Sequence, residues 1–91
     1  MEEKFIQTCN RLREEALQLG VRIRPVESME QAHRILSGHR QSDGFAQLAK
    51  LNRLDLTVEA QAVKKQFTAL FSDEEVNNAL MRLIDAGYGF K

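Results

Sequence analysis

Hydrophobic positions in the first twenty residues recur at alternating intervals of four and three, which is the spacing of a single helix face. They are Phe5, Cys9, Leu12, Ala16 and Leu19. Gly20 follows the last of them, and glycine ends a helix without steric cost. The pattern predicts a helix over residues 2–19, and its heptad-like stripe is also typical of a helix that packs against a second chain.

Four more helices are predicted by similar spacing, and two of them begin with a capping box. Ser28 with Gln31 and Ser72 with Glu75 have the required separation, in which each side chain bonds the backbone of the other residue. The predicted helices cover residues 28–37, 43–53, 57–71 and 72–86. In the third of these, Glu59, Lys64 and Lys65 are expected to face outward.

Apolar and basic residues alternate between Val21 and Arg24, which is the period of an extended strand. Pro25 also disfavours a helix at the residue before it. Because no other segment is a good strand partner, we expect an extended linker over residues 21–26. The alternative is a short bridge to residues 88–90.

The predicted fold is therefore all-α: a single helical domain over residues 1–91, built as a compact bundle of four to five short helices. A composition of 43% hydrophobic and 29% charged residues is ordinary for a globular protein. The predicted core consists of Phe5, Cys9, Leu12, Leu36, Phe45, Leu48, Val63, Phe67, Leu80, Leu83 and Ile84.

Charge and cysteine content restrict the functional classes. Thirteen basic and thirteen acidic residues cancel, which removes the usual argument for a general nucleic-acid binder. A single cysteine fits a reducing compartment. No stretch has the apolar core of a signal peptide or the length of a membrane span. We therefore expect a cytoplasmic protein without a membrane partner.

No group of residues has the spacing of a catalytic or metal site. His33 and His39 are six residues apart, whereas a helical metal pair needs three or four. Ser42 and Asp43 follow His39 closely, but no strand–turn–helix elbow surrounds the serine. Cys9 belongs to an apolar stripe, where a thiol is inert. We predict no enzyme activity, no metal and no cofactor.

Local charge is uneven although the total is zero. Basic residues gather between positions 22 and 40, and acidic residues gather from Ser72 onward. An exposed basic surface would favour an acidic partner, acting mainly on rate and specificity. The candidate partner-binding residues are Arg22, Arg24, Arg34, His39 and Arg40.

The preferred functional prediction is a non-enzymatic protein-interaction module: an adaptor, an inhibitor or a regulatory subunit that acts through helical surfaces. The partner would be another protein, or a second copy of this chain that docks through the helix over residues 2–19.

The alternative is a nucleic-acid-binding transcriptional regulator. Residues 56–90 resemble the helix-turn-helix part of winged-helix proteins. The matching residues are Leu80, Leu83, Ile84, Gly87 and Tyr88. The resemblance implies that the helix over residues 72–86 contacts DNA. Two features depart from that family: the chain ends where the wing would begin, and Asp73, Glu74 and Glu75 would repel phosphates. Nucleic acid is therefore not the favoured partner.

Overall fold

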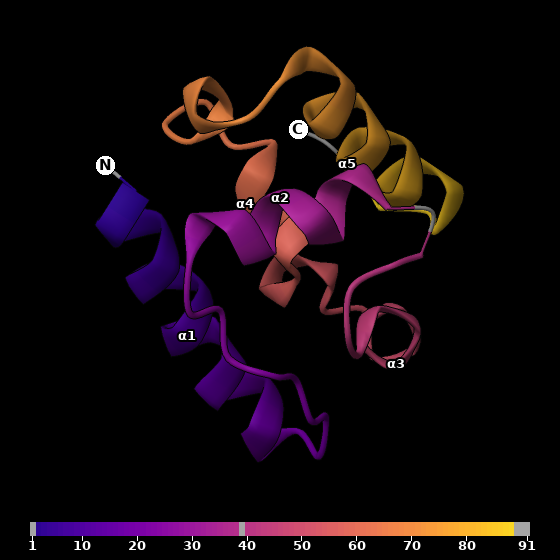
Figure 1. The fold of residues 1–91 in the computed structure, drawn as a ribbon. Coiled ribbons are helices and arrows are strands. Elements are labelled where there is room, and N and C mark those ends of the chain that lie inside the picture. Colours follow the sequence, from indigo (N-terminus) through magenta and orange to yellow (C-terminus); the bar gives the residue numbers. More distant parts are fainter. Residues whose placement is uncertain (1, 39, 89–91) are drawn as a thin grey trace.

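The computed structural model describes residues 2–38 and 40–88. Its elements are α1 (Glu2–Gln18), α2 (Met29–Ser37), α3 (Phe45–Lys50), the 3₁₀ turn η1 (Leu54–Leu56), α4 (Val58–Ala62), the 3₁₀ turn η2 (Thr68–Leu70) and α5 (Asp73–Asp85). None of the described residues forms a strand, so the all-α prediction is confirmed. The radius of gyration, 11.8 Å, agrees with the value of about 12 Å expected for a compact chain of this length. Figure 1 shows α2 and α4 in the middle, with α1 on one side and α3 and α5 on the other.

The two longest helices, α1 and α5, begin and end close to the predicted positions. Gly20 ends the first with a φ of +86°, in the left-handed region where glycine has no steric penalty. At the start of α5, the Ser72 hydroxyl accepts from the Glu75 N–H at 3.1 Å, and the Glu75 carboxylate accepts from the Ser72 N–H at 2.8 Å. The predicted capping box at Ser72 is thus confirmed.

The central helices are shorter than predicted. Residues 43–53 form only the six-residue α3, and residues 57–71 form only the five-residue α4 followed by a turn and η2. Beyond α4 the chain reverses, so that Phe67 and Phe71 both reach Phe5, with ring centroids 5.2 and 5.0 Å apart. This aromatic packing outweighs the helical periodicity of the segment, as tertiary contacts commonly do.

Most of the predicted core is buried, including Phe5, Phe45 and Phe67. Ile84 is a wrong assignment, because its side chain is half exposed, whereas the preceding Leu83 is fully buried. Consecutive residues on a helix differ by about 100°, so only one of the two faces the interior. The predicted core residues Leu12, Val63 and Leu80 are partly exposed.

The thiol of Cys9 lies in the main hydrophobic cluster, with a relative exposure of 6%. Burial raises the pKa of this thiol to about 12, an effect that the nearby Lys64 charge only partly opposes. At neutral pH it therefore stays protonated and unreactive.

Residues 21–28 have no regular secondary structure, as expected for an extended linker. Side chains replace the missing strand partner. The Asn10 amide oxygen accepts from the Val26 N–H at 2.9 Å, and its NH₂ donates to the Val26 carbonyl at 3.0 Å. The Arg13 guanidinium donates to the Ile23 carbonyl. Side-chain hydrogen bonds therefore fix this segment against α1 without a β-sheet. The alternative prediction, a short bridge to residues 88–90, involves residues 89 and 90, which lie outside the described residues.

Gln31 fixes the same segment from the side of α2. Ser28 accepts from the Gln31 N–H at 3.2 Å, as the capping motif predicts. The Gln31 side chain does not return to Ser28, however. Its oxygen accepts from the Glu27 N–H at 2.9 Å, and its NH₂ donates to the Pro25 carbonyl at 3.1 Å. The amide thus orients the linker as well as supporting the helix start.

Candidate binding cleft

The extended segment, α2 with Gly38, and the loop over residues 40–44 border a cleft of about 730 Å³. This size lies within the usual range of ligand sites. Its apolar lining comes from Ile23, Val26, Ile35 and Val58. The cleft also contains Arg24, Arg34 and Arg40. Three arginines that the sequence places at separate positions are therefore brought to one concave surface.

The three arginines differ in their partners. Arg24 forms a two-pronged ion pair with Asp43, whose oxygens lie 2.7 Å from its Nε and 3.2 Å from its Nη2. Arg34 and Arg40 are exposed and form no hydrogen bond or ion pair within the part of the chain that the structure describes. Of the described residues that line the cleft, Asp43 is the one acid. The lining therefore carries an excess of two positive charges.

Of the other two candidates, the structure places only Arg22 relative to this cleft. Arg22 is exposed and is absent from its described lining, and His39 lies outside the described residues. His33 has a structural role instead. Its Nδ1 lies 2.9 Å from a Glu75 oxygen, and its ring packs edge-on against Phe71 at a centroid distance of 5.3 Å.

The loop over residues 40–44 is held through Ser42 by a fully buried acid, Glu59. Its carboxylate accepts from both the backbone N–H of Ser42, at 2.9 Å, and the Ser42 hydroxyl. The prediction that Glu59 faces outward is therefore wrong. All five residues of α4 are buried, because other elements enclose this short helix on every side, so it has no outer face.

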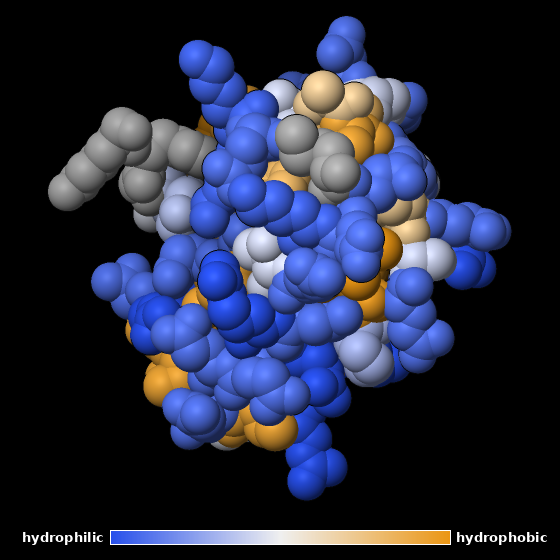
Figure 2. All heavy atoms as spheres, turned by 90° about the vertical axis from the view of Figure 1, so that its left-hand side faces the viewer, coloured by the Kyte–Doolittle hydropathy of each residue, from blue (hydrophilic) through white to orange (hydrophobic). Residues whose placement is uncertain are grey.

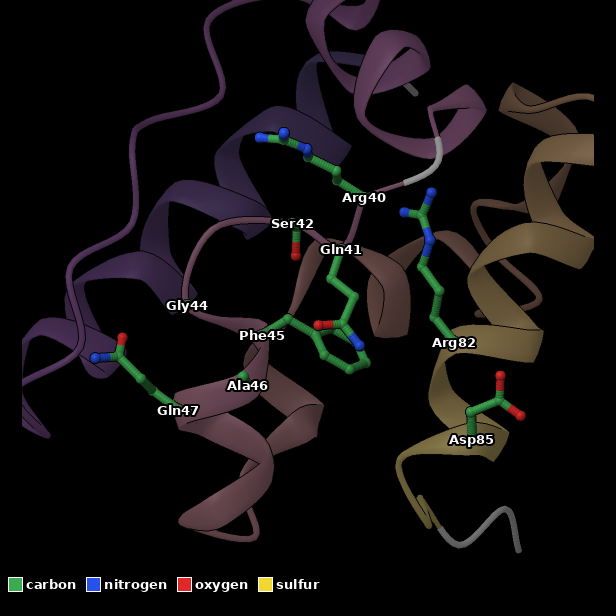
Figure 3. A pocket seen from close by; sticks show the side chains of 9 residues that line it. All are labelled: Arg40, Gln41, Ser42, Gly44, Phe45, Ala46, Gln47, Arg82 and Asp85. Carbon is green, nitrogen blue, oxygen red and sulfur yellow. The ribbon is translucent and has the colours of Figure 1, made fainter.

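Arg82 of α5 completes this buried network. Its Nη1 lies 3.2 Å from Glu59 and 3.1 Å from the Ile35 carbonyl, while its Nη2 donates to the carbonyls of Leu36 and Gly38. These carbonyls belong to the end of α2, where the helix itself supplies no donors. Figure 3 shows Arg82 reaching from α5 toward the loop that carries Ser42.

A second cavity of about 760 Å³ adjoins this loop and is also lined by residues of α3 and α5. It shares Arg40, Gln41 and Ser42 with the first and extends to Phe45 and Asp85 (Figure 3). The loop thus contributes to the lining of both cavities, and the Glu59–Arg82 pair holds it through Ser42 and Gly38.

Sequence reasoning missed the roles of Asp43, Glu59 and Arg82. One signal was present: Glu59 stands among Val58 and two alanines, residue types that are often fully buried. A buried acid needs a cation, and Arg82 is the single basic residue of α5. Nothing in the local pattern links the two positions, which are far apart in sequence.

The helix-turn-helix resemblance does not extend to the geometry. The first helix of the pair would be α4, which has only five residues, and residues 63–72 separate it from α5. A helix-turn-helix has a turn of three or four residues. Moreover, Arg82 points inward to Glu59, so α5 presents no basic side chain to a nucleic acid.

The apolar stripe of α1 is used within the chain. Phe5, Cys9 and Ala16 are buried, so the stripe no longer argues for a second copy, and homodimerisation stays an untested prediction. Leu17 and Leu19 are the large exposed apolar residues near the end of this helix. On the face drawn in Figure 2, hydrophilic side chains predominate and apolar ones form small separate groups.

No protein-family model, curated protein sequence or solved structure matches this chain. Over residues 2–38 and 40–88, no three His, Cys, Asp or Glu side chains are grouped as metal ligands would be. In the same ranges, no helix has both the length and the apolar character to cross a bilayer.

Proposed function

We propose that this chain is a protein-interaction domain that binds an acidic segment of a partner protein in the cleft beside α2. The observation that carries the proposal is that Arg34 and Arg40 line a concave, partly apolar surface without a partner among the described residues. Arginine binds carboxylates with a planar, two-pronged geometry, so such groups suit acidic ligands.

The cleft also supports a particular form of ligand. Its apolar side chains would receive one apolar residue of the partner, and the arginines would pair with carboxylates next to it. Apolar burial then contributes affinity, while charge complementarity contributes association rate and specificity. The matching ligand is a short segment in which Asp or Glu flanks Leu, Ile or Val.

Binding without catalysis is part of the same proposal. The Ser42 hydroxyl donates to Glu59, and the same carboxylate also accepts from the Ser42 N–H and pairs with Arg82, so both of its oxygens already have partners within the fold. Asp43 is engaged by Arg24. We also place the protein in the cytoplasm, because its one cysteine is a buried free thiol that needs no oxidising environment.

The test is an NMR titration of the ¹⁵N-labelled protein with the blocked peptide Glu-Leu-Glu-Leu-Glu, and with its counterpart in which lysine replaces each glutamate. We expect the acidic peptide alone to shift the amide signals of Ile35, Gly38 and Ser42. Added salt should weaken the binding, because it screens the charges involved.

Charge reversal identifies the residues responsible. Replacing both Arg34 and Arg40 by Glu should lower the affinity at least about tenfold, equivalent to about 1.4 kcal/mol. Arg11→Glu is the control, since Arg11 is an exposed arginine of α1 outside the cleft. The proposal fails if the acidic peptide causes no shifts, or if Arg11→Glu weakens binding as much. Shifts produced at these arginines by a short DNA duplex, and not by the peptide, would instead support the nucleic-acid alternative.

A further inference from the structure

The Arg24–Asp43 pair sits in the same cleft as the two unpaired arginines, yet it is held differently. Asp43 Oδ2 accepts from Arg24 Nε at 2.7 Å and from the Arg24 backbone N–H at 3.4 Å. Its Oδ1 accepts from Arg24 Nη2. The carboxylate therefore occupies the donor edge that a partner's carboxylate would otherwise use.

Asp43 is also fixed through its neighbours. The preceding residue, Ser42, is bonded to buried Glu59 through both its N–H and its hydroxyl. The following residue, Gly44, packs so closely on the extended segment that a Cβ there would lie 2.6 Å from Val21 Cγ1. A carboxylate anchored on both sides leaves the Arg24 guanidinium less readily than a partner's mobile side chain would.

From this geometry we propose that Asp43 is the specificity-determining residue of the cleft: it occupies Arg24 as an internal carboxylate and thereby limits an acidic partner to Arg34 and Arg40. The inference rests on the proposed function and adds a limit on how many partner carboxylates the cleft binds. A partner with two carboxylates can pair them with Arg34 and Arg40. A third carboxylate would find Arg24 already paired with Asp43, whose negative charge would repel it.

The test measures the affinity of the Glu-Leu-Glu-Leu-Glu peptide for a set of variants. Asp43→Asn frees Arg24 and should tighten binding at least about fivefold. Glu30→Gln makes the same change in net charge at an exposed position of α2 outside the cleft, and it should change the affinity less than about twofold. Arg24→Gln should weaken binding, because it leaves the Asp43 charge uncompensated.

The Arg24 side chain supplies a direct readout. Its Nε–H signal should not move when peptide is added to the unmodified protein, and it should move in Asp43→Asn. In an Arg24→Gln background, Asp43→Asn should produce a smaller gain, since only charge and no new contact is then involved.

The outcomes separate the two proposals. If Arg34 and Arg40 are needed for binding but Asp43→Asn binds no tighter than Glu30→Gln, the cleft binds acidic peptides and the role of Asp43 is wrong. The same conclusion follows if the Arg24 Nε–H signal moves on peptide addition to the unmodified protein. If neither the unmodified protein nor Asp43→Asn binds the peptide, the proposed function fails and this inference fails with it.

Discussion

Two arginine–carboxylate pairs hold the segment around Ser42 and Asp43. Arg82 and Glu59 are 3.2 Å apart, with side chains that are 11% and 0% exposed. Arg24 and Asp43 are closer, at 2.7 Å, but their side chains are 83% and 37% exposed. Water and dissolved ions weaken the exposed pair, whereas the buried pair lies in surroundings that leave each charge dependent on the other. Separation alone is therefore a poor guide to what a pair contributes.

Because the two pairs differ in exposure, they have different roles in the structure. The buried pair joins α4, α5 and the end of α2, and it bonds the backbone at four points: the Ser42 N–H and the carbonyls of Ile35, Leu36 and Gly38. The exposed pair joins the extended segment to the loop at the surface. We interpret the first as the support of the cleft and the second as a part of its binding surface.

The largest effect is expected from Glu59→Leu. This substitution leaves Arg82 buried without its carboxylate and removes the acceptor of both Ser42 hydrogen bonds. Breaking one partner of a buried ion pair costs about 3–5 kcal/mol. Chemical denaturation monitored by far-UV circular dichroism measures the loss.

A double variant determines whether the loss comes from the pair. Glu59→Leu with Arg82→Met removes both charges, so it should be more stable than the sum of the single losses predicts, by at least about 1 kcal/mol. The double variant should still be less stable than the unmodified protein, because the carbonyls at the end of α2 lose the donors of Arg82. Additive losses would show that the two side chains act independently.

The reliability of sequence reasoning differs between the ends of the chain and its middle. At α1 and α5, helical spacing coincides with local stop and start signals, such as Gly20 and the Ser72 capping box. Both helices are long enough for these local terms to determine their limits. The segments that form α3 and α4 have five or six helical residues, and their extent depends on contacts such as those of Phe67 and Phe71 with Phe5.

The second expected effect concerns the close contact of the loop with the extended segment. Gly20 and Gly44 both have positive φ, +86° and +74°. A Cβ at Gly20 meets nothing within 4 Å, whereas a Cβ at Gly44 would lie 2.6 Å from the side chain of Val21. Gly20→Ala should cost about 1–2 kcal/mol from backbone strain, and Gly44→Ala should cost about 1 kcal/mol more from overpacking. Equal losses in denaturation would show that the Val21 contact adjusts freely.

A similar distinction applies to the cleft. Linear charge clustering grouped Arg24, Arg34 and Arg40, and the structure places all three on its walls. Clustering could not show that Arg24 is already paired, because the pairing with Asp43 depends on how the loop folds back across the extended segment. Nor could helical spacing place Glu59 inside, since that spacing assumes a helix with one exposed face.

The third expected effect adds a pH dependence at the His33–Glu75 pair, whose side chains are 40% and 11% exposed. Burial would raise the pKa of Glu75, but hydrogen bonds from the Ser72 backbone and His33 outweigh it, and the pKa lies below its usual value of 4.5. A lowered pKa in the folded state means that the charged carboxylate stabilises the protein above the unfolded-state value. This contribution is lost as the pH falls below about 4.5 and through the folded-state pKa.

Glu75→Gln should therefore destabilise the protein by about 1 kcal/mol at neutral pH, and its deficit should shrink as the pH falls through that range. Denaturation curves of the variant and of the unmodified protein, recorded between neutral and acidic pH, measure the difference in their free energies of unfolding. Glu74→Gln is the matched control, because Glu74 is an exposed acid in the same first turn. A deficit that is constant with pH would contradict the lowered pKa.

The smallest effect on stability is expected at the exposed pair. Asp43→Asn should shift the melting temperature by less than about 4 °C, because ion pairs at the surface contribute little to folding. Glu59→Gln is the matched comparison: it neutralises the carboxylate of α4 that bonds Ser42 of the same loop, and it should shift the melting temperature several times further because Glu59 is fully buried. Equal shifts would remove the distinction between the two pairs. A small shift at Asp43, together with tighter binding of the acidic peptide, would show that this aspartate acts on ligand selection and that folding does not depend on it.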